Sequence, residues 1–136
     1  MMISTRGRYA LRVMIDLAEN SKGQYIPMKA VAERQNISLK YLERILPALV
    51  KNGFIEGVQG KSGGYRLTKQ PQDYCVGDIL RLTEGDLAPV SCLECGAQPC
   101  DMAKSCRTRP VWTKLYSAIN ETLDGITIAE LMKDDV

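Results

Sequence analysis

Two short helical patterns joined by a tight turn, with a glycine-rich hairpin pattern directly behind them, constrain the fold of this chain more than any other feature. The first pattern is MKAVAERQ, which follows Pro27, a residue suited to the first position of a helix. Asn36 breaks it, and Ser38 is placed to cap a second pattern, SLKYLERILPALVKNG, which ends at Asn52–Gly53. A short helix, a turn of about four residues and a longer helix form the helix-turn-helix pattern.

The segment after this pair predicts two short strands. Phe54–Ile55 and Tyr65–Leu67 are rich in residues that favour strands, and a basic, glycine-rich tip from Gly57 to Gly64 lies between them. A β-hairpin directly after a helix-turn-helix is a winged helix. We therefore expect a mainly α fold with a small β-hairpin wing.

Amphipathic helical patterns lie on both sides of this unit. Residues 9–19 carry apolar side chains at helical spacing before the pair, and residues 74–83 do so after the hairpin. Pro47, inside the longer helix of the pair, is expected to kink that helix or split it. Thr127 is placed to cap a final short helix.

A long apolar stripe runs from Val111 to Leu123, and Pro110 is well placed at the start of its helix. The stripe lies beyond the winged unit. We therefore interpret it as the surface of a long C-terminal dimerisation helix, with domain core as the alternative.

The net charge of +2 conceals an asymmetry between the two halves of the chain. Residues 1–70 carry twelve Lys and Arg against five Asp and Glu, a balance of +7, whereas residues 71–136 carry six against eleven, a balance of −5. This split predicts that the N-terminal half faces a polyanion, although chance variation among surface charges would also produce it. With no apolar run near the roughly 18 residues of a membrane helix and no secretory signal, we expect a cytoplasmic protein.

The first turns of the longer helix of the pair would supply a surface that reads DNA. A recognition helix presents its N-terminal side chains to base edges in the major groove, where Arg44 can bind guanine through two hydrogen bonds. Glu43 repels phosphate but can accept from cytosine, so it would penalise wrong sequences. The wing would enter the minor groove, and solvation remains the alternative for each basic residue. The predicted DNA-binding residues are Ser38, Lys40, Tyr41, Glu43, Arg44, Gln59, Lys61, Ser62, Arg6 and Arg8, with Arg66 as a further candidate.

A cluster of thiols stands in the C-terminal half. Residues 91–106, SCLECGAQPCDMAKSC, hold four of the five cysteines, and we expect this segment to be a loop. The candidate interpretations are disulfide bonds, which a reducing compartment disfavours, a zinc site, an iron–sulfur site and a redox-active thiol set. The spacing C-x2-C-x4-C-x5-C is close to that of a zinc knuckle, so spacing alone does not separate zinc from iron–sulfur. Cys75, outside the loop, is expected to be a buried apolar residue.

Three stretches together resemble the Rrf2 family of winged-helix transcription regulators. They are STRGRYALRVMIDLA at the start, ISLKYLERILPALVKNGFIEGVQGKSGGYRL in the middle, and CRTRPVW with ITIAEL at the end, so the resemblance covers nearly the whole chain. The arrangement of cysteines ahead of a helix that contains Trp112 resembles that of the cluster-binding members of the family. The resemblance implies a homodimer that binds a pseudo-palindromic operator in double-stranded DNA. It also implies that loop cysteines ligate a [2Fe–2S] cluster, or in some relatives a [4Fe–4S] cluster.

The resemblance assigns the ligands residue by residue. Cys100 and Cys106 match the middle and last cysteines of the family, whereas Cys92 and Cys95 flank the position of the first, for which we favour Cys92. Cluster-binding members complete the site with a histidine. This chain has Arg109 there and contains no histidine, and a guanidinium cannot deprotonate to become a ligand. Either Cys95 or a carboxylate would therefore complete the site.

These observations predict a DNA-binding transcriptional regulator that senses cluster status, redox state, iron or nitric oxide through a [2Fe–2S] cluster. We divide the chain into a winged helix-turn-helix DNA-binding domain at 1–70 and a cysteine-loop sensor region with the dimerisation helix at 71–136. We do not expect an enzyme, because the chain has neither a histidine nor a nucleophile–base pair. Two alternatives stay open. One is a family member that acts through a partner protein instead of a cluster, and the other is a zinc-stapled DNA-binding protein whose sensor lies elsewhere.

Overall fold

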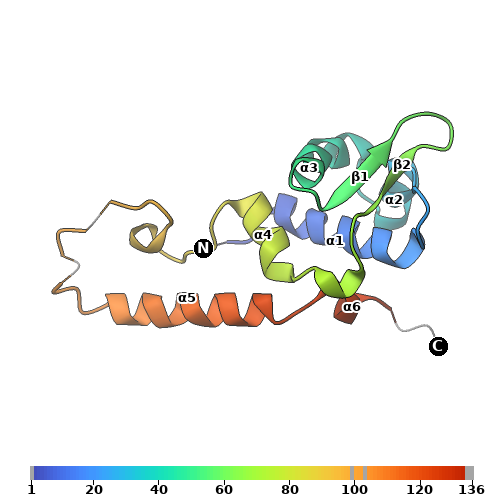
Figure 1. Ribbon diagram of the computed structural model, residues 1–136. Helices are drawn as coiled ribbons and strands as arrows, with labels where there is room; N and C mark the ends of the chain where they lie inside the picture. Colours follow the sequence, from blue (N-terminus) through green and yellow to red (C-terminus); the bar gives the residue numbers. More distant parts are fainter. Residues whose placement is uncertain (1, 99, 103, 134–136) are drawn as a thin grey trace.

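The structure is a computed structural model that describes residues 2–98, 100–102 and 104–133. This described part is mainly helical and contains one two-stranded antiparallel sheet, as the sequence predicts (Figure 1). The helices are α1 (Thr5–Asn20), α2 (Met28–Gln35), α3 (Leu39–Lys51), α4 (Val76–Glu84), α5 (Arg109–Asp124) and α6 (Ile128–Leu131), with 3-10 turns η1 (Pro71–Asp73) and η2 (Ser91–Leu93), and the strands are β1 (Ile55–Val58) and β2 (Gly64–Leu67).

Helix α1 lies at the centre of the fold, where it contacts α2, α3, α4, α6 and β2. The helix predicted for 9–19 begins earlier, at Thr5, and its buried face is rotated from the predicted one. Of the predicted stripe Leu11, Met14, Ile15 and Ala18, only Met14 is fully buried, whereas Asp16, expected outside the stripe, is buried. The earlier start follows from Ser4, whose Oγ accepts a hydrogen bond from the Gly7 amide at 3.1 Å and so caps the first turn. The core around α1 also contains Tyr74 and Ile128, so residues on both sides of the predicted boundary at residue 70 share one core.

The helix-turn-helix forms where the sequence predicts it. Asn36 ends α2 in a left-handed conformation with φ 53°, and the Ser38 Oγ accepts from the Tyr41 amide at 3.0 Å to start α3. Pro27 stands directly before α2 as its N-cap residue, one position earlier than expected.

The expectation that Pro47 splits α3 is wrong, because α3 runs through it without interruption. Proline removes the hydrogen bond that would be donated to the carbonyl of Glu43, and both residues are exposed. Water can therefore satisfy that carbonyl. The buried side chains of Leu46 and Leu49 hold the helix against the core on either side of the proline.

The wing is longer than the sequence indicates. Strand β1 pairs with β2 from Ile55 opposite Leu67 to Val58 opposite Gly64, so the tip contains only residues 59–63. On its other side β2 pairs with the segment before α2, since Tyr65 and Ile26 exchange two backbone hydrogen bonds of 2.9 Å.

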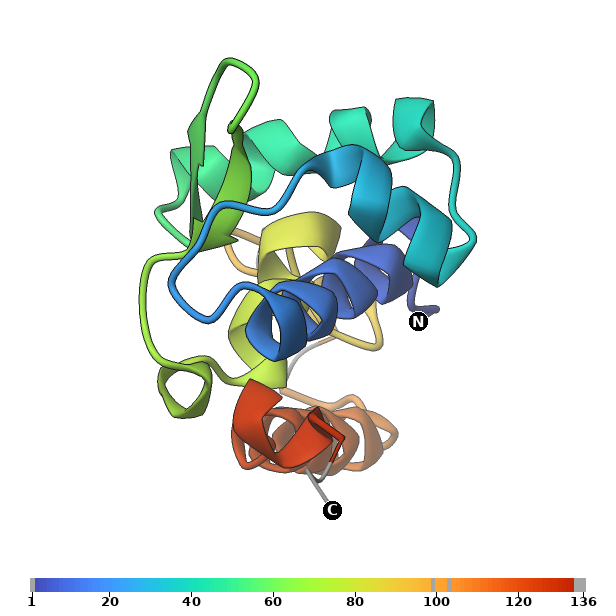
Figure 2. The same ribbon diagram turned by 90° about the vertical axis from the view of Figure 1, so that its right-hand side faces the viewer.

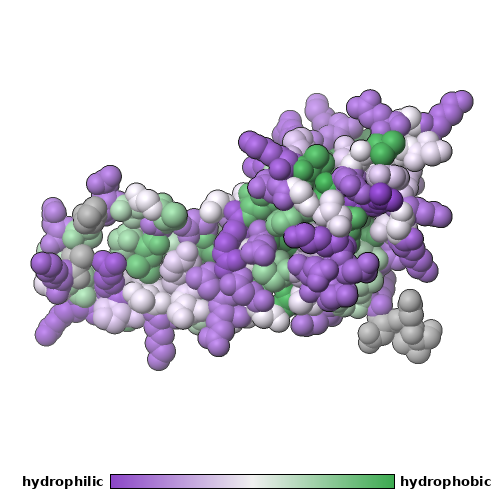
Figure 3. Space-filling model, in the orientation of Figure 1, coloured by the Kyte–Doolittle hydropathy of each residue, from purple (hydrophilic) through white to green (hydrophobic). Residues whose placement is uncertain are grey.

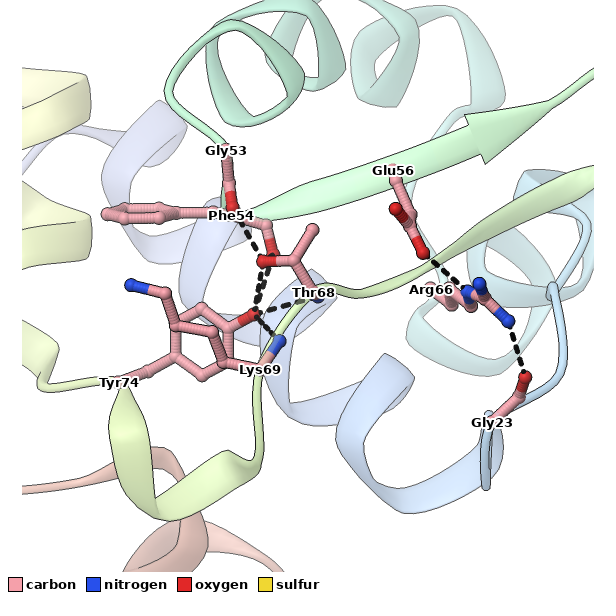
Figure 4. Close-up of polar contacts among 8 residues, drawn as sticks. All are labelled: Gly23, Gly53, Phe54, Glu56, Arg66, Thr68, Lys69 and Tyr74. Carbon is pink, nitrogen blue, oxygen red and sulfur yellow. Dashed lines mark hydrogen bonds and ion pairs between the residues drawn. The ribbon is translucent and has the colours of Figure 1, made fainter.

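Tyr74 fixes the base of the wing to the start of α4 (Figure 4). Its hydroxyl donates to the Phe54 carbonyl at 2.8 Å and accepts from the amides of Thr68 and Lys69 at 3.0 and 2.9 Å. Its ring packs edge-on against that of Phe54, with the centroids 5.9 Å apart. The wing is therefore held at its base by buried polar and aromatic contacts while its tip projects freely.

Helix α5 extends away from the main body on the side opposite α3, and the cysteine loop runs back along it to α4 (Figures 1 and 2). Its inner side meets a second apolar cluster built on Val76, Leu80 and Leu87, against which Ile119 and Leu123 pack. No residue of α5 is fully buried. None of the described helices has the length and apolarity needed to cross a membrane.

Candidate nucleic-acid interface and cysteine loop

The predicted DNA-binding residues of α3 and of the wing lie on one side of the molecule. Helix α3 runs along the top of Figure 2 and the wing tip projects beside it, whereas α5 lies at the bottom. On the face shown in Figure 3, mostly hydrophilic side chains cover this upper region. The exposed members of the predicted set here are Ser38, Lys40, Glu43, Arg44, Gln59, Lys61 and Ser62.

Tyr41 differs from these residues because it is half-buried. Its ring packs edge-on against Tyr9 of α1, with centroids 5.2 Å apart, and the Arg12 guanidinium lies 5.4 Å from the centre of the Tyr9 ring. Arg12 also donates to the side chain and the carbonyl of Gln35 at the end of α2. These contacts fix the start of α3 to α1, so Tyr41 has a positioning contact that the sequence did not reveal.

The arginines proposed for phosphate contact have different environments. Arg6 is exposed in the first turn of α1, and Arg8 donates to Thr5 Oγ1 at 2.9 Å in the same turn. Arg66 is engaged within the wing, where it pairs with Glu56 at 2.6 Å and donates to the Gly23 carbonyl at 3.0 Å (Figure 4). Its guanidinium also stacks on the Tyr25 ring. The hydrogen bond to Glu56 raises the pKa of Arg66. Arg66 is therefore a weaker candidate for phosphate contact than Arg6.

All five cysteines are free thiols. In the loop, Cys95 and Cys100 are exposed, Cys92 is half-buried in η2, and Cys106 is half-buried just before α5. Cys106 has a specific neighbour, the Thr108 hydroxyl 3.4 Å from its sulfur. That hydroxyl, followed by the backbone amides of Thr108 and Arg109, lowers the pKa of the Cys106 thiol.

The cysteine loop contains sulfur ligands suitable for a metal centre, but it does not hold them close together. Among the described residues, no three loop sulfurs lie within 4.8 Å of one another. A tetrahedral zinc site with Zn–S bonds of about 2.3 Å would need all its sulfurs roughly 3.8 Å apart. The chemistry fits an iron–sulfur or zinc site, because thiolates are the ligands of both and none of the four loop thiols is fully buried. Binding would have to draw the loop together.

The expectation that Cys75 is a buried apolar residue is wrong. Cys75 is half-buried at the N-cap of α4, where its sulfur accepts from the Asp78 amide at 3.4 Å and donates to the Asp124 carboxylate at 3.8 Å. Partial burial raises the pKa of its thiol. Asp78 and Asp124 both contact the Arg81 guanidinium, at 3.4 and 2.8 Å. Since Arg81 already supplies the compensating positive charge, this group is an ion-pair network that joins α4 to α5.

Asp86 is a residue at this site that sequence reasoning missed. One carboxylate oxygen accepts from the Ala88 amide at 2.8 Å and the Tyr116 hydroxyl at 3.0 Å, and the other accepts from the Cys95 amide at 2.7 Å. The two amides lower the pKa of Asp86 more than any other contact. An aspartate two residues before an amide is typical of a turn, so only the bond to Ala88 had a local signal in the sequence.

A family profile described as Rrf2, iron-dependent transcriptional regulator, matches residues 3–134. The chain belongs to the Rrf2 family. Among curated relatives of this Rrf2 protein is the HTH-type transcriptional regulator IscR of Vibrio atlanticus (strain LGP32), 36% identical over 135 residues that span 99% of this chain and 77% of the relative. Another is protein rrf2 of Nitratidesulfovibrio vulgaris (strain Hildenborough), 38% identical across 98% of this chain and 89% of the relative.

Solved structures agree with the fold of the Rrf2 protein. CymR, the global cysteine regulator of B. subtilis, superposes with a TM-score of 0.79 at 34% identity and covers 96% of this chain and 95% of its own. IscR of T. potens gives a TM-score of 0.75 at 35% identity, covering 96% and 85%. The predicted family and winged-helix fold are confirmed. The relatives are named as transcription regulators and not as enzymes, as expected for this chain.

Proposed function

We propose that this Rrf2 protein regulates transcription according to the state of an iron–sulfur cluster held by its loop cysteines. The observation that carries the proposal is the location of four thiols in one loop between α4 and α5, on the side of the molecule opposite α3. The description of the family as iron-dependent and the relatives named IscR support it. A loop of accessible or half-buried thiols that is remote from α3 suits a sensor rather than a DNA contact.

The proposed DNA contacts follow from exposure. Lys40, Glu43 and Arg44 project from the first turns of α3 and would meet base edges in the major groove, with Ser38 and Tyr41 at the phosphates. The wing residues Gln59, Lys61 and Ser62 would enter the minor groove. Arg6 and Arg8 at the start of α1 would contact the backbone.

The proposed ligands are Cys92, Cys100 and Cys106, with Cys95 as the fourth. When bound, a [2Fe–2S] cluster would supply a group whose presence and charge depend on iron and oxidants. A [4Fe–4S] cluster or zinc would use the same thiols. The chain holds no histidine for the fourth place. Both oxygens of Asp86, the carboxylate that contacts the Cys95 amide, already accept hydrogen bonds.

The proposed dimer uses α5. Val111 and Leu115 are 56% and 43% exposed, in the part of α5 that lies N-terminal to Ile119 and Leu123, and Met102 of the cysteine loop is 60% exposed. Figure 3 shows a hydrophobic patch over the cysteine loop, next to α5. An apolar groove is lined by Ile3, Leu80 and Ile119. A second copy of the chain would cover this surface. A two-fold pair would then place two α3 helices on half-sites about one DNA turn, roughly 34 Å, apart.

The chain itself provides a route from the loop to α3. Arg81 of α4 binds Asp124 and Asn120 of α5, α4 packs on α1, and α1 holds the start of α3 through Tyr9 and Tyr41. A change in how α5 lies on α4 would therefore reach the DNA-binding surface through packed elements. By linkage, operator DNA should alter cluster retention to the same degree as the cluster alters operator affinity.

The decisive experiment is the visible absorption and Mössbauer spectrum of protein purified without oxygen, with iron, sulfide and zinc assayed on the same sample. We expect iron and sulfide in matching amounts. A colourless protein with one zinc per chain would contradict cluster sensing and make the loop a structural staple.

A regulator that responds through a partner protein is the second candidate. The likeness to CymR of B. subtilis favours it, because that structure superposes as well as those named IscR. Replacing the four loop cysteines with serine separates the two candidates. Cluster sensing predicts loss of the effect of iron and oxidants on operator affinity, whereas the second candidate predicts that regulated binding survives.

A further inference from the structure

Asp86 connects three parts of the molecule through one carboxylate. It lies two residues after α4 and accepts from the Cys95 amide in the loop and from the Tyr116 hydroxyl on α5. Both partners lie C-terminal to Asp86, nine and thirty residues further along the chain. A local turn would need only the hydrogen bond from the Ala88 amide. The other two hydrogen bonds join parts of the chain that are distant in the sequence.

Tyr116 belongs to a polar stripe on the inner side of α5. It is followed at four-residue spacing by Asn120 and Asp124, which places all three on one face of the helix. Asn120 and Asp124 accept from Arg81 of α4 at 2.9 and 2.8 Å. Helix α5 is thus joined to α4 by Arg81 near its C-terminal end and, through Tyr116 at its middle, to Asp86, which also contacts the cysteine loop.

We propose that Asp86 is a positioning residue that ties the Cys95 turn to α5, so that a change of ligation at Cys95 changes how α5 lies on α4. This inference rests on the proposed function, because it takes Cys95 as a ligand. Drawing Cys95 towards the other thiols displaces its amide, which must either carry Asp86 and Tyr116 with it or break their hydrogen bonds. Either outcome is transmitted to the helix that forms the proposed dimer surface.

Three variants test whether Asp86 joins the Cys95 turn to α5. Asp86→Ala removes all three hydrogen bonds, and Tyr116→Phe removes only the one to α5. Glu94→Gln is the matched control, because it neutralises an exposed carboxylate next to Cys95. The Glu94 side chain makes no hydrogen bond among the described residues. Thermal unfolding monitors whether each variant remains folded.

The first measurement is amide hydrogen exchange on metal-free protein, which does not depend on a cluster. Asp86→Ala should accelerate exchange at the Cys95 amide about tenfold or more, since a hydrogen bond to a charged group is lost. Tyr116→Phe should accelerate exchange in α5 around residue 116, and Glu94→Gln should change neither. Unchanged exchange at Cys95 in Asp86→Ala would overturn the tie.

The second measurement compares exchange in α5 with and without reconstituted cluster. In the wild type, loading should change exchange both in the loop and in α5. In Tyr116→Phe the change around residue 116 should disappear, while iron and sulfide content and the melting temperature remain close to wild type. If loading still alters exchange around residue 116 in this variant, Asp86 has only a structural role. If the wild type takes up no iron and sulfide, the proposed function fails. The exchange measurement on metal-free protein would still test whether Asp86 joins the Cys95 turn to α5.

Discussion

At the scale of single residues, Asp16 shows how the helix-turn-helix is held to α1. Its side chain is 1% exposed and accepts two hydrogen bonds from Arg34, at 3.0 and 2.7 Å, and one from Gln35 at 2.9 Å. A buried carboxylate is tolerated only when its charge is paired and its oxygens are bonded. Both partners lie at the end of α2, so the network fixes the turn that leads into α3.

Asp16→Asn should lower the free energy of unfolding by about 2–3 kcal/mol, because the Arg34 guanidinium loses its buried partner. Urea unfolding measures the change. Glu33→Gln, which neutralises an exposed carboxylate on α2, should change stability by less than about 0.5 kcal/mol. Equal losses in the two variants would show that the network contributes little.

Variants at Arg44 and Lys61 would distinguish a contact to a base from a contact to a phosphate. Arg44→Ala should weaken binding to the specific operator by about 1–3 kcal/mol, with little effect on unrelated DNA, because a guanine contact is lost. Lys61→Ala should weaken binding to all sequences and reduce the slope of log K against log salt by about one. Titration of labelled operator and scrambled DNA at several salt concentrations measures both, and a uniform loss in Arg44→Ala would contradict base reading.

At the scale of elements, two junctions give the fold its form. The wing is attached through Tyr74 at its base and through the pairing of β2 with Ile26. Helix α5 is attached through its apolar inner face and through the Arg81–Asp124 ion pair. Each junction joins segments far apart in the sequence, so each is formed by tertiary contact rather than by local propensity.

Gly64 is the residue that allows the first junction. Its φ is +153°, and an added Cβ would overlap the carbonyl of Ile26. Gly64→Ala should therefore lower the free energy of unfolding by about 2 kcal/mol or more, measured by urea unfolding. Gly60→Ala is the control, because its φ is +112° and a Cβ there meets nothing within 4 Å. A loss as large in Gly60→Ala would mean that backbone strain, and not the overlap, is responsible.

The second junction should depend on pH. The ion pair with Arg81 holds the pKa of Asp124 below its ordinary value of 3.8, and Cys75 and Asp78 are the other titratable groups that face it. A lowered pKa stabilises the fold above the ordinary value, and this contribution is lost as pH falls through the folded-state pKa. Asp124→Asn should reduce the melting temperature near pH 7 and have a smaller effect at about pH 3. The exposed Asp73→Asn is the control, and an equal effect of Asp124→Asn at both pH values would contradict the ion pair.

At the scale of the whole molecule, the residues proposed for DNA binding and those proposed for sensing lie on two sides. The helix and wing that carry the predicted DNA contacts lie on one side, and α5 with the cysteine loop lies on the other (Figure 2). The charge asymmetry follows the same division, since residues 1–70 carry +7 and residues 71–136 carry −5. This division agrees with the proposal that the acidic half pairs with a second copy while the basic half of each copy faces DNA.

Leu115→Glu should convert a dimer into monomers, because it places a charge on the exposed apolar side of α5. Sedimentation velocity measures the mass, and operator affinity should fall by about two orders of magnitude when two half-sites are no longer bound together. Ser117→Glu adds the same charge two positions away, on the opposite side of the helix, and should leave the dimer intact. A Leu115→Glu protein with unchanged mass would place the dimer surface elsewhere.

Local sequence signals determined the elements of this protein. Ser38 and Thr127 cap α3 and α6 as predicted, because capping depends only on a side chain and an amide three residues later. The apolar spacing in 38–53 likewise identified the buried face of α3, apart from the exposed Leu39. In α1 the spacing identified a helix but not which residues it buries. The same patterns indicated the winged fold and the family.

Only the tertiary structure determined which contacts form between elements that are distant in the sequence. Pro47 does not split α3, because packing on either side outweighs the loss of one hydrogen bond at the surface. Cys75 lies in an ion-pair network, and Asp86 joins the loop to α5, because their partners Asp124 and Tyr116 come from distant parts of the chain. Periodicity and capping report contacts within a few residues, whereas these contacts exist only once α4 and α5 have packed together.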